Sequence, residues 1–413
     1  MSVLGLVLIL GQLAPVAAAP GEGPVLTILD RSEARLRTRL PGTGVATDLE
    51  TLPVLTVTQR TLRSDVAIGY AAQLSYLDVV ENPQFTVAQS VRLSGAYMLD
   101  RGLRVFTNIQ GTVGKQYVEG LVTTPTLAPT PTTPVTTTTP TAFVAPIPVI
   151  DSLSYRADVG VGYKLSALWD VLGTVAWAGG EGLDTASRVA IPRYYGPSAS
   201  TTLGYTATRR DRFTTNFNVA YTTSPTINSD FLSVALTEAW TRSFSVRTTG
   251  YAGAGLSFQH GDPGTNQRST SDFYPDGELG VNYAVPVGFA ESISFRLGTR
   301  LGFHYDAVLR SSSPEASGQA SAIYTSPHVG ASLNATAVTT LSSSVQAQAA
   351  RQVGGGATVW YSPTRALRFE LGARGYVQDL PGNLPTIAGA VPTNTFQWAT
   401  FVALVVVPPA IEL

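Results

Sequence analysis

Residues 153–178 read LSYRADVGVGYKLSALWDVLGTVAWA. In the first half of this stretch, two kinds of side chain alternate with a period of two residues. Every second residue from Leu153 to Leu165 is apolar, and Tyr155 and Tyr163 belong to this set. The residues between them are small, polar or charged. A period of two residues is typical of a β-strand whose two faces meet different surroundings. The stretch therefore predicts strands with one apolar and one polar face.

The same alternation recurs over most of the chain, from the segment 65–76 to the segment 395–406. Short connections, such as Asp100-Arg101, mostly alternate with long ones, such as 306–326. This arrangement places tight turns at one end of a sheet and open loops at the other. We predict an all-β chain with about 16 strands, and even counts from about 14 to 18 also fit the pattern.

The composition excludes several classes of protein. Charged residues make up 13% of the 413 residues, about half of the ~25% usual in soluble globular proteins. The formal net charge of −1 argues against a nucleic-acid partner held by bulk charge. The chain has no cysteine, so it has no disulfide, no thiolate metal ligand and no catalytic cysteine.

The N-terminus has the pattern of a targeting segment. Residues 2–19 are mostly apolar and end in Ala17-Ala18-Ala19. This pattern predicts a signal peptide at 1–19, cleaved before Pro20. A membrane-anchoring helix is the alternative interpretation of the same stretch. Beyond it, no run of about 18 uninterrupted apolar residues predicts a spanning helix.

With these alternating strands, the chain resembles a bacterial outer-membrane β-barrel over residues 64–408. The resemblance implies a single closed antiparallel transmembrane β-barrel, because only closure pairs every backbone amide of a strand inside hydrocarbon. The apolar set then faces lipid and the polar set lines the lumen. A soluble β-sandwich also alternates, but its outer face is rich in Lys, Glu and Asp. The polar set here is mostly Gly, Ser, Thr, Ala and Asn.

The predicted organisation follows from this interpretation. The transmembrane barrel covers 63–408, and 118–152 forms a Thr/Pro-rich extracellular loop within it. Residues 20–62 are predicted as a periplasmic N-terminal segment, and 51–62 is alternatively a further strand or a segment inside the pore. Residues 409–413 form a C-terminal tail.

Aromatic residues near the ends of the outward sets predict the two girdles of a transmembrane barrel. The predicted girdle residues are Tyr155, Tyr163, Trp169, Trp177, Phe295, Tyr305, Trp240 and Trp398. Outer-membrane barrels commonly finish on an aromatic residue in the last strand, whereas here the sequence PPAIEL follows that strand. Phe401 and Trp398 are the candidates for the aromatic role.

Charged residues on the polar set predict the lining of the lumen. An Arg or Lys that faced lipid near mid-membrane would cost ~2–4 kcal/mol, so these groups should point inward. The predicted basic lining residues are Arg92, Arg104, Arg156, Lys164, Arg247, Arg296, Arg300, Arg368 and Arg374. The predicted acidic lining residues are Asp65, Asp158, Glu278 and Glu370. The basic excess predicts a pore tuned for anions, and ion pairs that stiffen the barrel are the alternative.

Little in the sequence indicates catalysis. Of the three histidines, His260, His304 and His328, His304 falls on the lumen parity of its strand, as the base of a barrel hydrolase would. No spacing singles out a serine nucleophile, so a pore-lining role is the preferred interpretation of His304. Because no metal-ligand cluster or phosphate-binding loop occurs, we predict no catalytic residue, no metal and no cofactor.

A barrel of about 16 strands encloses a water-filled lumen unless something plugs it. We therefore predict a passive channel in the bacterial outer membrane for hydrophilic, mainly anionic solutes or polymer. The chain also loosely resembles exopolysaccharide-export barrels, which implies a polysaccharide as the transported molecule. The expected partners are the lipid bilayer, this solute or polysaccharide, and a periplasmic export protein or a second copy of the chain. The alternatives are an outer-membrane lipid or ester hydrolase and a non-conducting adhesion or assembly scaffold.

Overall fold

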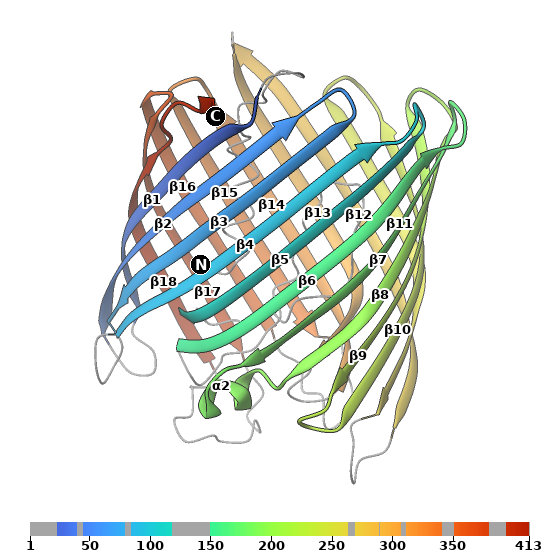
Figure 1. Ribbon diagram of the computed structural model, residues 1–413, viewed down its shortest axis with the longest axis horizontal. Coiled ribbons are helices and arrows are strands. Elements are labelled where there is room, and N and C mark those ends of the chain that lie inside the picture. Colours follow the sequence, from blue (N-terminus) through green and yellow to red (C-terminus); the bar gives the residue numbers. More distant parts are fainter. Residues whose placement is uncertain are drawn as a thin grey trace.

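The computed structural model describes residues 23–38, 44–78, 84–117, 149–262, 269–288, 290–306, 311–340, 351–379 and 394–412. Within this part of the chain, eighteen antiparallel strands form one closed barrel, in which consecutive strands pair and β1 also pairs with β18 (Figure 1). The barrel strands are β1 (Val25–Thr38), β2 (Val45–Arg60), β3 (Ser64–Leu77), β4 (Gln84–Met98), β5 (Leu103–Tyr117), β6 (Val149–Lys164), β7 (Trp169–Gly182), β8 (Tyr194–Thr206), β9 (Asp211–Ser224), β10 (Ser229–Ser243), β11 (Thr248–Asp262), β12 (Thr270–Gly288), β13 (Glu291–Asp306), β14 (Ser311–Thr325), β15 (Val329–Thr340), β16 (Arg351–Thr364), β17 (Leu367–Asp379) and β18 (Asn394–Val406). The two-residue strand β19 (Ile411–Glu412) pairs with the start of β1, and the short helix α2 (Thr185–Ala190) follows β7.

The predicted closed all-β barrel is confirmed, with a strand number at the upper end of the predicted range. One strand that the sequence analysis missed is β14, which occupies the predicted long connection 306–326. The outward positions of β14 include Ala316, Gly318 and Ala320, and these small residues alternate with Ser and Gln. The hydropathy contrast between the two faces is therefore weak, and the alternation is hard to see in the sequence.

The first two strands correct the prediction of a periplasmic segment at 20–62. β1 pairs with β2 over its whole length, and Asp30–Arg37 of β1 pairs with β18. The stretch Asp30–Arg39 reads DRSEARLRTR, in which arginine and glutamate occupy the lumen-facing positions. These charged side chains resemble an exposed polar segment and conceal the alternation. The predicted signal peptide 1–19 lies outside the described residues, as does most of the predicted loop 118–152.

The two ends of the barrel differ in their connections. Tight turns at one end join β2 to β3, β4 to β5, β6 to β7 and so on around the barrel. The start of β1 and the short strand β19 lie at this end, toward the top of Figure 1, whereas the connection with α2 lies at the other end. In transmembrane barrels the short turns are periplasmic and the longer loops are extracellular. The start of β1 is therefore on the periplasmic side.

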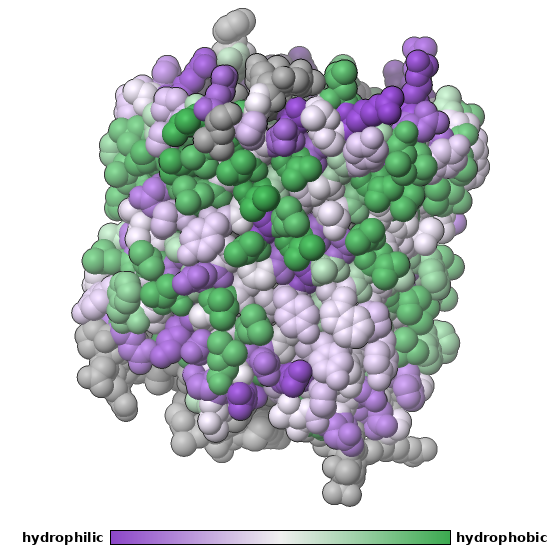
Figure 2. All heavy atoms as spheres, in the orientation of Figure 1, coloured by the Kyte–Doolittle hydropathy of each residue, from purple (hydrophilic) through white to green (hydrophobic). Residues whose placement is uncertain are grey.

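The outer surface of the barrel is apolar. Outward side chains such as Val159, Val175 and Leu236 remain exposed although they are hydrophobic. Figure 2 shows hydrophobic side chains over much of the middle of the visible face, and hydrophilic side chains gathered near the upper and lower rims. In the described part of the chain, no helix is both long and apolar enough to span a membrane.

Candidate pore lining

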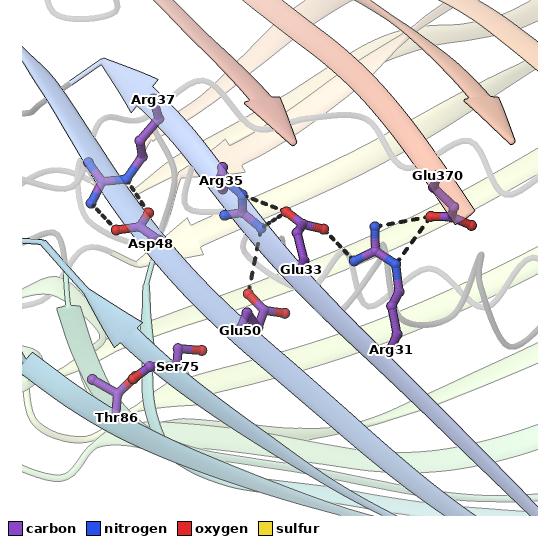
Figure 3. A network of polar contacts seen from close by, with 9 residues as sticks. All are labelled: Arg31, Glu33, Arg35, Arg37, Asp48, Glu50, Ser75, Thr86 and Glu370. Carbon is purple, nitrogen blue, oxygen red and sulfur yellow. Dashed lines mark hydrogen bonds and ion pairs between the residues drawn. The ribbon is translucent and has the colours of Figure 1, made fainter. Parts of the chain in front are cut away.

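Charged side chains line the lumen face where the first and last strands meet, a region called here the seam (β17, β18, β1 and β2). Arg31, Glu33 and Arg35 follow one another on the lumen face of β1 (Figure 3). Glu33 forms ion pairs with both arginines, and the distance from Glu33 Oε1 to Arg35 Nη2 is 2.6 Å. All three residues are at most 5% exposed. The carboxylate between two guanidinium groups offsets part of the cost of burying these charges.

Two further contacts extend the seam across neighbouring strands. Arg31 Nη2 lies 3.2 Å from Glu370 Oε2 on β17, so this ion pair passes over β18. Arg37 on β1 donates to both carboxylate oxygens of Asp48 on β2, from Nε at 2.6 Å and from Nη2 at 3.1 Å. Arg31 and Glu370 are 339 positions apart in the chain. The seam is therefore joined by ion pairs as well as by the backbone ladder that closes the barrel.

Next to these charges, the lumen face of the seam is apolar. Leu29, Leu52, Val54 and Val405 of the seam form a buried hydrophobic cluster with Ala71 of β3, and this cluster lies toward the periplasmic end of the strands. This patch departs from the predicted polar lining. It gives the seam a packed inner surface from which water is excluded.

A second charged region, called here the basic wall, lies on the lumen face of β4, β5 and β6. Arg92 Nε donates to Asn108 Oδ1 at 3.2 Å, and Asn108 Nδ2 donates to Asp158 Oδ1 at 3.3 Å. Arg156 Nε lies 3.3 Å from the same carboxylate oxygen. The Asp158 carboxylate thus contacts Arg156 directly and is linked to Arg92 through Asn108. This part of the wall keeps a net positive charge.

Arg104 and Lys164 extend the basic wall toward the periplasmic end. The pairing of Arg104 with Gly162 places both side chains at the same end of β5 and β6. Both residues are exposed, and neither forms an ion pair with a residue that the structure describes. Exposed cationic groups that line an aqueous pore favour anionic solutes.

The opposite side of the barrel has a different balance of charge. β14 lies nine strands from β5 around the circle of eighteen. Among the described side chains, the lumen face of β12, β13 and β14 carries four acids, Asp272, Asp276, Glu278 and Glu315, and two bases, Arg296 and Arg300. Arg300 Nη2 lies 3.8 Å from Asp276 Oδ2. Positive charge is therefore distributed unevenly around the lumen, with its excess on the basic wall.

The structure places all but one of the predicted lining residues on the lumen face. These are Arg92, Arg104, Arg156, Lys164, Arg296, Arg300, Arg368, Arg374, Asp65, Asp158, Glu278 and Glu370. The exception is Arg247, which lies in the turn between β10 and β11 because β10 continues to Ser243. The role of these residues in transport stays a prediction.

The lumen face carries further charged residues that the sequence pattern did not predict. Those with described side chains are Arg31, Glu33, Arg35, Arg37, Asp48, Glu50, Arg60, Asp170, Arg212, Asp272, Asp276 and Glu315. The missed acids outnumber the missed bases, so the basic excess of the whole lumen is smaller than predicted. The alternation of Arg and Glu by twos in Asp30–Arg39 is the signal that could have revealed the first of them.

The predicted girdle residues lie on the outward face where the structure describes their side chains. Trp169 stacks on Tyr205 near the periplasmic end, with ring centroids 4.4 Å apart. Trp177 stacks on Tyr195 toward the other end, with centroids 6.0 Å apart. Tyr155, Tyr163, Phe295, Trp240 and Trp398 share the outward parity of their strands, and the side chain of Tyr305 lies outside the described residues. Phe401, the other candidate for the terminal aromatic, faces the lumen.

Large rings on the lumen face lie close against the wall. A Cβ atom on Gly160 would lie 2.1 Å from Cζ of Phe106, and a Cβ atom on Gly330 would lie 2.0 Å from Cζ2 of Trp360. Each ring therefore covers a glycine of the neighbouring strand, where any other residue would clash. Because of these glycines, the bulky rings lie close against the barrel wall.

The two histidines whose side chains the structure describes, His260 and His328, do not form a recognisable catalytic group. His260 lies on the outward parity of β11, with Nδ1 2.8 Å from the Ser271 hydroxyl. His328 lies in a turn, with Nδ1 3.0 Å from the Ser362 carbonyl oxygen. The side chain of His304 lies outside the described residues. The described residues contain no group of three or more His, Asp or Glu that could hold a metal ion.

Comparisons with known proteins give a family and several similar barrels. A model of the EpsX exopolysaccharide export family matches residues 28–406. Similar solved structures include OccAB3 of Acinetobacter baumannii, with 9% identity and a TM-score of 0.47 over 93% of this chain and 99% of that chain. The outer membrane protein OprD of Pseudomonas aeruginosa has 8% identity and a TM-score of 0.48, over 96% and 97% of the two chains. A bacterial polysaccharide outer membrane secretin has 9% identity and a TM-score of 0.39, over 92% and 98%.

No curated protein matches the chain. The family match, in contrast, extends from β1 to the end of β18 and so includes the whole closed barrel. The barrel and the family together place the protein in the bacterial outer membrane. The chain belongs to the EpsX exopolysaccharide export family.

Proposed function

We propose that the barrel conducts an anionic exopolysaccharide through the outer membrane, from the periplasm to the cell surface. The observation that carries this proposal is the basic wall. Arg92, Arg104 and Lys164 are exposed on the lumen face, and none has a carboxylate partner among the described residues. Membership of an export family supports a polysaccharide as the transported molecule, and the basic wall supports a negative charge on it.

The chemistry of the basic wall suits a chain that must move. Two opposite unit charges about 4 Å apart in water attract each other by about 1 kcal/mol. A carboxylate or sulfate group on the polymer would therefore bind each cation weakly and exchange it for the next. Conduction requires sites that are favourable enough to occupy and weak enough to leave. Strong, buried ion pairs such as those of the seam would not meet the second condition.

The proposal is tested with the purified protein in planar lipid bilayers. Reversal potentials under a KCl gradient report the preference for anions or cations. Oligogalacturonate, a linear chain of uronic acids, is then compared with dextran of the same length, which is uncharged. We expect a preference for anions and a block by oligogalacturonate at lower concentration than by dextran. A preference for cations, or equal responses to both polymers, would overturn the proposal.

A further inference from the structure

The tight turns at the periplasmic end carry a cluster of arginines, called here the basic rim. Its members are Arg63, Arg101, Arg209, Arg210, Arg247 and Arg365, all of them exposed. They come from five turns, which follow β2, β4, β8, β10 and β16. The described residues of the tight turns include one acid, Asp100, whose Oδ1 accepts the backbone N–H of Arg101 at 2.6 Å. This end of the barrel is therefore strongly positive.

Three acids at the neighbouring strand ends form ion pairs with arginines that lie outside the basic rim. Asp65 is paired with Arg60 at 3.2 Å, and Asp170 is paired with Arg212 at 2.7 Å. Asp211, which follows Arg210 in the chain, lies 3.6 Å from Arg242. Within the part of the chain that the structure describes, none of the six rim arginines forms an ion pair. Their charges are available to a partner.

The turns hold several of these arginines in the same way. In three turns, a Ser or Thr hydroxyl accepts the backbone N–H of the arginine two residues later, at 3.1–3.2 Å. The pairs are Thr61–Arg63, Thr208–Arg210 and Ser245–Arg247. Such bonds stabilise a tight turn. The backbone of the rim is thus ordered before any partner binds.

The basic rim is continuous with the basic wall. The backbone N–H of Lys164 donates to the carbonyl oxygen of Gly102 at 2.8 Å, which joins the turn that carries Arg101 to the end of β6. Arg104 follows two residues after Gly102 on the lumen face of β5. Exposed acids are frequent among the described residues of the other end of the barrel. They include Asp184, Asp230, Asp262 and Asp272.

From this arrangement we infer that the basic rim is a binding site for the polyanion on the periplasmic side, from which the chain passes into the lumen along the basic wall. The inference rests on the proposed function and adds to it a capture site at the periplasmic entrance. Positive charge around an opening attracts anions and raises their association rate by about 10- to 1,000-fold. Phospholipid phosphates are the other anions near this rim. The continuity of the rim with the lumen wall favours a chain that enters the pore.

The test uses the full-length protein inserted in one orientation in a planar bilayer. Oligogalacturonate of fixed length is added to one side at a time, and the rate and duration of blocking events are recorded at low salt. The test variant replaces all six rim arginines by glutamine, and the matched control replaces them by lysine. We expect the glutamine variant to lower the blocking rate from the periplasmic side at least ~10-fold. The blocking rate from the extracellular side and the block duration should stay unchanged, and the lysine variant should behave as wild type.

The possible outcomes separate the inference from the proposed function. If oligogalacturonate blocks the wild type and the glutamine variant at the same periplasmic rate, the capture site is wrong while the anionic conduit stands. If the wild type prefers cations and neither side responds to oligogalacturonate, the proposed function itself fails. The measurement is repeated in phosphatidylcholine and in phosphatidylglycerol bilayers. An effect of the glutamine variant that occurs only with phosphatidylglycerol would assign the rim to lipid headgroups and overturn the inference.

Discussion

The seam and the basic wall carry the same residue types on the same face of the barrel, but their surroundings differ. At the seam, Arg31 and Arg35 are 4% and 3% exposed, and Glu33 lies between them. On the basic wall, Arg92 and Arg104 are exposed and have no carboxylate partner among the described residues. Lumen parity alone therefore does not tell a structural charge from one available to a solute.

Burial and pairing decide between the two roles. A buried ion pair that loses one partner leaves an uncompensated charge in a medium of low dielectric constant, which is strongly destabilising. An exposed charge costs little to remove, because water solvates it and salt screens it. We therefore expect substitutions at the seam to change stability, and substitutions on the basic wall to change selectivity.

The largest expected effect is that of Glu33→Gln at the seam. The substitution removes the carboxylate shared by Arg31 and Arg35 and leaves two buried guanidinium groups with one partner fewer. By comparison with other buried pairs, the free energy of unfolding should fall by about 3–5 kcal/mol. Urea titration of the folded barrel, followed by its faster migration in unheated gels, measures this change.

Arg60→Gln is the matched control for the seam. Arg60 and Asp65 form an ion pair at 3.2 Å, with side chains 36% and 45% exposed. Loss of this exposed pair should cost less than about 1 kcal/mol. Equal costs for Glu33→Gln and Arg60→Gln would mean that the seam network does not stabilise the closure of the barrel.

The second prediction concerns the double variant Arg92→Gln/Arg104→Gln on the basic wall. Each cation attracts an anion at contact by about 1 kcal/mol in water, which corresponds to about a fivefold change in local anion concentration. The reversal potential should therefore shift toward cations, while the free energy of unfolding changes by less than about 1 kcal/mol. The variant Arg92→Lys/Arg104→Lys keeps the charge and should keep the wild-type reversal potential. An unchanged reversal potential in the glutamine variant would remove the basic wall from the account of selectivity.

The third prediction reverses the sign of the effect on the same wall. Asp158→Asn removes the carboxylate that Arg156 contacts at 3.3 Å and adds no bulk. The preference for anions should rise, because one negative charge is removed from the wall. The local anion concentration should increase by up to about fivefold. The difference from wild type should vanish in 1 M salt, where the screening length is about 3 Å. A difference that persists in 1 M salt would indicate a change in the shape of the pore.

These regions differ in how far the sequence predicts them. The alternation by twos located Arg92, Arg156 and Asp158 on one face, because each strand of the basic wall has a clear apolar face. It failed for β1 and β2, whose lumen face carries arginine and glutamate, and for β14, whose outward face is mostly alanine and glycine. The pair Arg31–Glu370 depends on closure between strands 339 positions apart. No local pattern contains that information, so the pairing and burial of the seam required the structure.

The smallest expected effect is that of Phe401→Leu. This variant tests whether the Phe401 ring stabilises the seam or acts as the aromatic assembly signal of the last strand. The Arg31 guanidinium carbon lies 5.6 Å from the centroid of the Phe401 ring, and the ring also covers Gly372. Loss of this cation–π contact should lower the free energy of unfolding by about 0.5–1 kcal/mol. Trp398→Leu, on the outward face of the same strand, leaves the seam intact and serves as the control.

Both variants are compared for unfolding in urea and for the amount of barrel inserted into the outer membrane. A terminal aromatic that acts as an assembly signal would affect insertion and leave the urea midpoint of the inserted protein unchanged. A seam residue would lower the midpoint. We expect Phe401→Leu to lower the midpoint because its ring packs against Arg31, whose ion pair with Glu370 spans the closure of the barrel. Phe401→Leu could instead reduce the amount of inserted barrel and leave the urea midpoint unchanged. The Phe401 ring would then act in assembly of the barrel and would not stabilise the seam.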